Sequence, residues 1–251
     1  MKRQYVFLLF LLIVILSGCN SLKGKETISQ TVPENTVIKS QQFLKNGVVA
    51  EYPFIVAGGN AKDINIWNQI IKKDFDKIID IYSFEPMPLP EPAPTRNMTI
   101  LNIKYDTKLN NSNYLSFLYW ADFNSNYSAH PSELTYSTNI NKKNNKRINL
   151  GDVVKLNKDF VKEFRTWDFI PIEQGNEELN KAIKDYFNNI SDDELLNGFK
   201  KADIIESGNV MDMYSYMTTD ALGISIGVPH YIGDHVEFER KYDKISKFLK
   251  K

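Results

Sequence analysis

The chain has 251 residues, of which 42% are hydrophobic, and it balances 31 basic residues against 31 acidic ones. Nucleic-acid binding depends on a basic surface, so this balance argues against a nucleic-acid partner. A single cysteine excludes an intramolecular disulfide. The apolar content is sufficient for one sizeable hydrophobic core.

The N-terminus has the three parts of a secretory signal peptide. Two basic residues precede an apolar run of eleven residues, Val6–Leu16. A membrane span needs about 20 apolar residues, so this run predicts a signal-peptide core rather than a transmembrane helix. Residues 16–19, Leu-Ser-Gly-Cys, resemble the bacterial lipobox, in which the cysteine takes a diacylglyceryl group before cleavage on its N-terminal side. The alternatives are an ordinary signal peptide with a chance cysteine, and an uncleaved anchor.

Cys19 is therefore the predicted lipidation site. It is the only cysteine of the chain, and a leftover cysteine in an exported protein needs an explanation. One acyl chain anchors only marginally, whereas the two or three chains of a bacterial lipoprotein, palmitate among them, hold durably. We expect residues 1–18 to be removed as a lipoprotein signal peptide, which leaves 29 basic and 31 acidic residues and a net charge of −2. The mature chain is expected at the extracytoplasmic face of the cell membrane.

Residues 19–46 are mostly polar and predict a flexible tether, which makes residues 47–251 the folded domain. Val48–Val56 predicts a strand, and Asn60 is positioned to cap a following helix. In that helix the apolar residues recur at spacings of three and four: Ile64, Trp67, Ile71, Phe75 and Ile78. This period predicts a long amphipathic helix.

Proline occupies every second position of the segment 85–94. Proline lacks the N–H donor and fixes φ, so we expect an extended polyproline II segment here. A stiff connector across the surface is one interpretation, and a docking strip for an aromatic groove is the other.

The rest of the chain alternates between groups of strands and groups of helices. We expect strands first at 98–108, 114–123 and 134–140, then helices at 176–189 and from 191, then strands at 210–217, 223–228 and 236–242, and a short terminal helix at 243–250. Segregated strands and helices indicate an α+β fold. The predicted architecture is a curved antiparallel β-sheet packed by a long N-terminal helix and a central helical segment.

No motif of a hydrolase elbow, phosphate-binding loop, dinucleotide site or metalloprotease is present. We therefore assign no catalytic residue and expect no cofactor. His230 and His235 are five residues apart and would face opposite sides of a straight strand. Although Gly233 is able to bend the chain between them, we expect no metal site.

Tyr127 and His130 form the candidate binding surface. They belong to a Tyr-Ser-Ala-His-Pro segment between two predicted strands, and connecting loops often carry binding residues. The alternative is that His130 is a loop histidine that makes only a structural hydrogen bond.

Short segments along the chain resemble a known domain. They are Tyr52-Pro53, Ile66–Asn68, Asn113–Phe117, Ser128–Pro131, Tyr136–Ile140, Ile148–Val154, Thr219–Ile224, Pro229–Gly233 and Tyr242. In order and spacing they resemble the domain in the outer part of lysozyme-sensing anti-sigma factors of the RsiV type, which also occurs beside peptidoglycan deacetylase domains. The resemblance covers roughly residues 48–250. It implies an α+β domain with a curved antiparallel sheet and does not imply catalysis.

The chain departs from this family because we find neither a transmembrane span nor a sigma-binding segment, so the anti-sigma role is not carried over. No lysozyme-contact residues are carried over either, since no short motif fixes them. We expect a membrane-anchored binding module for an envelope protein or a peptidoglycan-related ligand. The alternative is a hydrolase of cell-envelope polymers, with His130 and His230 as general acid or base.

Overall fold

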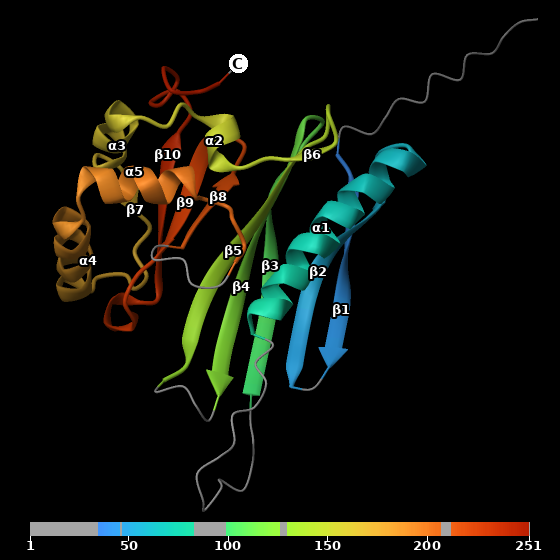
Figure 1. Ribbon diagram of the computed structural model, residues 1–251, viewed down its shortest axis with the longest axis horizontal. Helices are drawn as coiled ribbons and strands as arrows, with labels where there is room; N and C mark the ends of the chain where they lie inside the picture. Colours follow the sequence, from blue (N-terminus) through green and yellow to red (C-terminus); the bar gives the residue numbers. More distant parts are fainter. Residues whose placement is uncertain (1–34, 46, 83–98, 126–129, 207–211, 251) are drawn as a thin grey trace, which may run out of the picture. The chain divides into compact units, whose positions relative to one another are not determined.

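The computed structural model describes residues 35–45, 47–82, 99–125, 130–206 and 212–250 (Figure 1). The predicted signal peptide, Cys19, the first part of the tether, the proline-rich segment 85–94 and Tyr127 lie outside the described residues.

The larger of two sheets has six strands in sequence order. They are β1 (Val37–Lys45), β2 (Val48–Ala57), β3 (Thr99–Asn110), β4 (Tyr114–Ser125), β5 (Ser132–Asn141) and β6 (Lys146–Arg147). All neighbours are antiparallel except β2 and β3, which pair in parallel over Val48–Ala50 and Leu101–Ile103. The predicted α+β fold is confirmed, and the curled sheet is mixed. A parallel pair needs a crossover connection, and the helix between β2 and β3 is part of it.

Strand β1 corrects the prediction of a flexible tether through residue 46. It pairs along its whole length with β2, from Val37–Ala57 to Lys45–Val48. Its residues are mostly exposed, and only Ile38 and Phe43 are partly buried and packed on the core. The polar composition of this segment therefore reflects a strand at the sheet edge.

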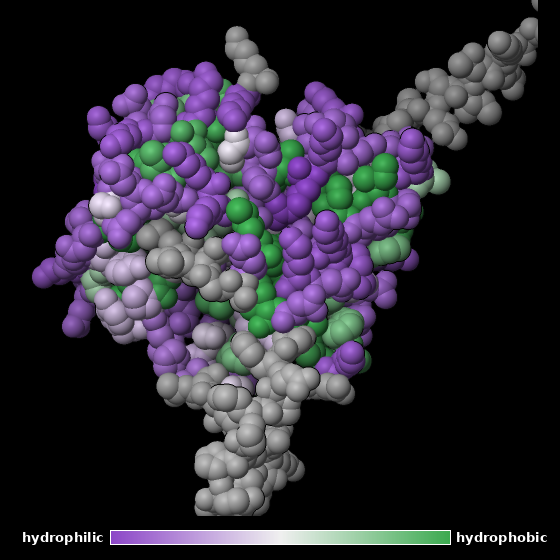
Figure 2. Space-filling model, in the orientation of Figure 1, coloured by the Kyte–Doolittle hydropathy of each residue, from purple (hydrophilic) through white to green (hydrophobic). Residues whose placement is uncertain are grey.

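Helix α1 (Ala61–Ile81) confirms the predicted amphipathic helix. The side chain of Asn60 caps it by accepting from Asp63 N. Trp67, Ile71, Phe75 and Ile78 are buried against the sheet. Figure 2 shows a mostly hydrophilic surface where α1 faces solvent. None of the described helices is both long and apolar enough to cross a membrane.

The second sheet has four antiparallel strands in the order β7-β10-β9-β8. These are β7 (Asp168–Phe169), β10 (His235–Lys241), β9 (Ala221–Gly227) and β8 (Met213–Met217). Four helices accompany it: α2 (Leu150–Val153), α3 (Lys158–Phe164), α4 (Glu177–Asn189) and α5 (Asp192–Lys200). Aromatic residues of α3, α4 and α5, among them Phe160, Phe187 and Phe199, pack with the sheet in one core.

The predicted terminal helix at 243–250 is wrong. The backbone there forms successive turns, in which Lys244 N donates to Lys241 O and Phe248 N to Ile245 O. The end of the chain pairs with the segment after α2, because Lys250 N donates to Val153 O and Lys155 N to Phe248 O. This tertiary pairing replaces the helical bonds that the local pattern favoured.

A polar layer lies where β5 meets the second sheet. Side chains alternate across a strand, and one face of β5 presents Glu133, Thr135, Ser137 and Asn139 to that sheet. Each of the last three makes a buried hydrogen bond: Thr135 Oγ1 with Ser225 Oγ of β9 at 2.7 Å, Asn139 Nδ2 with Ser215 O of β8 at 2.8 Å, and Ser137 Oγ at 2.9 Å with Oδ1 of Asp203, which lies after α5. The other face of β5 packs under α1 through Tyr136 and Ile140.

Candidate functional site

The three histidines gather near the start of β5, although His130 lies about 100 residues before His230 and His235 in the sequence. The rings of His130 and His230 stack with their centroids 3.6 Å apart and their planes 12° apart. His130 precedes β5, His230 begins the 3-10 helix η1 (His230–Ile232), and His235 begins β10. The structure therefore joins the predicted residue His130 to a second imidazole, from the connection between β9 and β10 of the other sheet.

Asp234 holds this arrangement together. One of its carboxylate oxygens accepts Glu133 N at 3.0 Å, and the other lies 3.0 Å from His230 Nδ1. The chain reaches this position through a bend in which Gly233 has φ 109° and Asp234 has φ 65°. Aspartate is among the few residues with a side chain that tolerate left-handed φ. The chain therefore does bend at Gly233, as the sequence analysis allowed.

Hydrogen bonding fixes the protonated nitrogen of each ring. His130 Nδ1 lies 3.0 Å from Pro131 O, and His235 Nδ1 lies 3.4 Å from Glu133 O. Carbonyl and carboxylate oxygens only accept, so Nδ1 carries the proton in all three rings. In a neutral ring with this tautomer, Nε2 is the acceptor.

Carboxylates surround the histidines. Glu133 lies directly opposite Asp122 in the β4–β5 register. Partial burial, followed by the hydrogen bond to Asp122 and the charges of Asp122, Asp234 and Glu237, raises the pKa of Glu133 to about 7. His235 lies between two of these acids, with Nδ1 3.7 Å from Glu133 Oε1 and Nε2 4.0 Å from Glu237 Oε1.

We call this set the His130 surface: Asp122, His130, Glu133, His230, Asp234, His235 and Glu237. The side chains of His230 and Glu133 are each 48% exposed, whereas those of Asp234 and His235 are 13% exposed. The outer groups can meet a large partner, and the inner groups hold them in place. Across the described residues, no three histidine, cysteine or acidic side chains are placed to hold a metal ion.

Sequence reasoning found His130 and, for the hydrolase alternative, His230. It missed Asp234 and Glu133, because their hydrogen bond joins residues 101 positions apart. The local signal for Asp234 was its place after Gly233 in a tight bend. Tyr127, the other predicted surface residue, lies in the part of the loop that the structure leaves undescribed.

No protein-family model matches the chain, and no curated protein matches its sequence. The structure is similar to a member of the DUF3298 family from Bacteroides fragilis, at 12% identity and a TM-score of 0.49, over 87% of this chain and 96% of that one. It is also similar to a DUF3298 family protein from Pseudomonas aeruginosa, at 12% identity and a TM-score of 0.47, over 87% and 95% of the two chains.

Proposed function

We propose that this chain is a lipid-anchored protein of the cell envelope, and that its domain binds an envelope protein or a peptidoglycan-related ligand through the His130 surface. The signal-peptide pattern and the sole cysteine at Cys19 support the anchor. The resemblance to the domain of lysozyme-sensing proteins supports a binding role rather than catalysis.

The observation that carries the proposal is the composition of the His130 surface. Its exposed imidazoles offer hydrogen-bonding ring nitrogens, and Asp122, Asp234 and Glu237 add carboxylates beside them. Lysine and arginine side chains of a partner supply the complementary donors, since charge-assisted hydrogen bonds are among the strongest. The surface therefore fits a cationic partner, for which lysozyme is a direct probe.

The anchor is tested by fractionating cells that express the wild-type chain or the Cys19→Ala variant. The wild type should sediment with membranes, and the variant should lose membrane attachment while its domain still folds. A Cys19→Ala variant that stays with membranes after a salt wash would overturn the lipid anchor.

Binding is tested by immobilising the full chain and measuring capture of lysozyme and of purified peptidoglycan. A His130→Ala/His230→Ala double variant should capture less than wild type. Lys181→Ala, an exposed change on α4, should capture as much as wild type. Capture no greater than on empty beads contradicts the binding role, and capture unchanged in the double variant contradicts the surface.

Hydrolysis of envelope polymers is the second candidate, and one observation favours it. A carboxyl with a pKa near 7 matches the needs of a general acid at neutral pH. Against it, Glu133 and Asp122 hydrogen-bond each other, whereas glycosidase carboxyls stand apart across the scissile bond. If Glu133→Gln and His130→Ala release as much labelled wall product as wild type, this function is excluded.

A further inference from the structure

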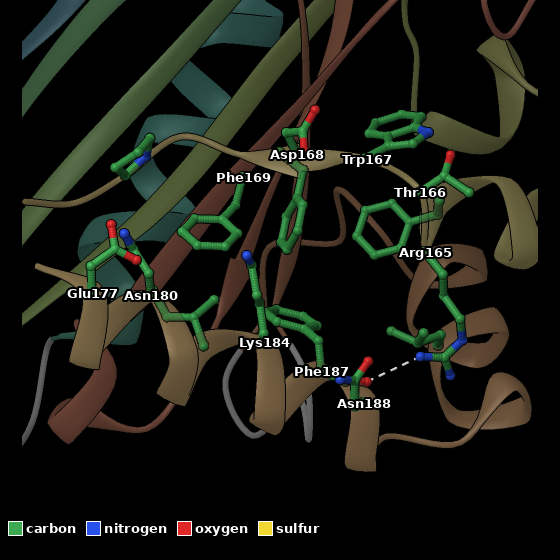
Figure 3. Close-up of a pocket in the computed structure, with 15 residues that line it drawn as sticks. Arg165, Thr166, Trp167, Asp168, Phe169, Glu177, Asn180, Lys184, Phe187 and Asn188 are labelled. Atoms are coloured by element: carbon green, nitrogen blue, oxygen red, sulfur yellow. Dashed lines mark hydrogen bonds between the residues drawn. The ribbon is translucent and has the colours of Figure 1, made fainter. Parts of the chain in front are cut away.

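Two hollows lie on opposite faces of α4. The first, of about 540 Å³, lies between the helix and β7, and Lys184 reaches into it toward the Phe169 ring (Figure 3). The second, of about 450 Å³, is lined on α4 by residues 182, 185, 186 and 189, whose spacing places them on the other face of the helix. Glu194 of α5 and Tyr231 of η1 line its other sides, and we call it the Tyr231 pocket.

Two tyrosines give the Tyr231 pocket its aromatic part. Tyr231 is the most exposed large hydrophobic residue in the part of the chain that the structure describes, with 74% of its surface accessible. Tyr186 is partly buried, and this burial, followed by Tyr231 and Glu194, raises the pKa of its phenol, which therefore stays neutral. Tyrosine is enriched among the residues that dominate binding energy at protein interfaces, so an exposed tyrosine beside a pocket is suited to contact a partner.

Both charged residues of the lining are acidic. Hydrogen bonds from the Ser191 side chain and backbone hold the pKa of Glu194 below its usual range, so this group is a carboxylate at neutral pH. Those bonds reach Oε2 at 2.7 and 2.9 Å, whereas Oε1 accepts from no described residue. Asp185 makes no ion pair with any residue that the structure describes, although Lys181 lies four positions before it on α4. The pocket therefore presents negative charge that these residues do not neutralise.

The Tyr231 pocket adjoins the His130 surface. Tyr231 follows His230 directly in η1, and α4 packs against η1. Asp234 lies 3.0 Å from His230 Nδ1 on the side of the His130 surface, and Asp185 and Glu194 belong to the pocket. A cationic partner that binds the His130 surface therefore meets further carboxylates where η1 ends.

We propose that the Tyr231 pocket receives an arginine side chain of the partner protein. The planar guanidinium stacks on tyrosine rings, and its five donors serve the carboxylates of Asp185 and Glu194 together. The proposal rests on the proposed function for the identity of the partner as a cationic protein. It adds a contact outside the His130 surface, and the preference of the pocket for a guanidinium is measured without any partner.

NMR titration of the full chain, with isotope-labelled tyrosine, tests the pocket alone. The probes are N-acetyl-L-arginine methylamide and its citrulline analogue, which has nearly the same shape and no charge. The arginine probe should shift the ring signals of Tyr186 and Tyr231 and bind at least about fivefold more tightly than the citrulline probe, because its hydrogen bonds are charge-assisted. Equal affinity for the two probes, or no shift at either tyrosine, overturns the proposal.

Two variants assign the contact. Asp185→Asn should reduce the preference for the arginine probe to about twofold or less. Asp159→Asn removes an exposed carboxylate of α3 outside the lining and should keep the wild-type preference, which separates a local contact from net charge. Asp185 is exposed, so its variant should fold like wild type, whereas Glu194 is left unchanged because it caps α5. An unchanged preference in Asp185→Asn also overturns the proposal.

Capture of lysozyme by immobilised chain separates this proposal from the proposed function. Tyr231→Ala should capture less lysozyme than wild type. Full capture by Tyr231→Ala, together with reduced capture by His130→Ala/His230→Ala, overturns the role of the pocket and leaves the His130 surface supported. No capture by the wild type, together with arginine-selective shifts of the two tyrosines, contradicts the proposed function and supports the pocket as a guanidinium site.

Discussion

Arg147 Nε donates to Asp74 Oδ2 across 2.6 Å, and this ion pair ties β6 to the buried face of α1. The Asp74 side chain is only 4% exposed, and it also accepts the Thr138 hydroxyl at 2.9 Å. The same guanidinium donates to Asp203 O at 2.7 Å. Asp203 in turn belongs to the polar layer between the sheets, so one arginine connects α1, the large sheet and that layer.

We predict that Arg147→Met destabilises the protein by roughly 3–5 kcal/mol, because it leaves the buried Asp74 carboxylate without its cation. Urea unfolding followed by circular dichroism measures the change. Lys72→Met is the control, since it breaks a Lys72–Asp76 pair whose side chains are 47% and 49% exposed. An exposed pair contributes about 0–1 kcal/mol. Similar losses in the two variants would show that the burial of Asp74 does not matter.

Glu133 should give stability a distinct pH dependence. Its pKa is raised from the ordinary value of 4.5 to about 7, chiefly by partial burial and then by Asp122. A carboxyl whose pKa is raised in the folded state favours folding at low pH, and this contribution is lost as pH rises through the folded pKa. Between about pH 4.5 and 7 the wild type should therefore lose stability relative to Glu133→Gln.

The measurement is the free energy of unfolding of both proteins at closely spaced pH values. The difference between them should change through that window and level off above it. Glu178→Gln, an exposed change on α4, should follow the wild-type curve. A constant offset between wild type and Glu133→Gln from pH 4 to 8 would contradict the raised pKa.

Gly223 is required by its cross-strand neighbour. It pairs with Tyr216 of β8, and a Cβ at position 223 would lie 2.2 Å from the buried Tyr216 ring. Gly223→Ala should therefore destabilise the protein by about 1–3 kcal/mol through overpacking. In contrast, a Cβ at Gly151 of α2 would meet only Leu156, at 3.6 Å. Gly151→Ala should stabilise the protein by about 0.5–1 kcal/mol. Thermal unfolding measures both variants, and a higher melting temperature for Gly223→Ala than for Gly151→Ala would contradict the predicted clash with Tyr216.

Local patterns were sufficient for part of the fold. The spacing of Trp67, Ile71 and Phe75 predicted α1, because the buried residues of an amphipathic helix recur every three or four positions. The turns at 243–250 and the parallel pairing of β2 with β3 could not be predicted in this way, since both depend on partners distant in sequence. Strand β1 was missed because most of its side chains face solvent.

The candidate site, like the fold, could be predicted only where the signal is local in the sequence. His130 could be proposed from the sequence because it lies in a predicted loop between two strands, and that prediction needs only local sequence. Its stacking on His230 depends on the packing of β5 against η1, which lies between β9 and β10, and these elements are distant in the sequence. The periodicity of a sequence gives no information about contacts between side chains that are distant in the chain.

The polar layer along β5 has a consequence for the His130 surface at its end. Apolar faces can slide past one another at little cost, whereas hydrogen bonds require one direction and one distance. The hydrogen bonds of Thr135 to β9 and of Asn139 to β8 therefore fix the position of the second sheet against β5, and a slip of that sheet by one residue would break both. Glu133 is the next position outward on the same face of β5. The interior thus sets how far His130 lies from His230, and a mutation in the buried layer would misalign the two imidazoles without touching either.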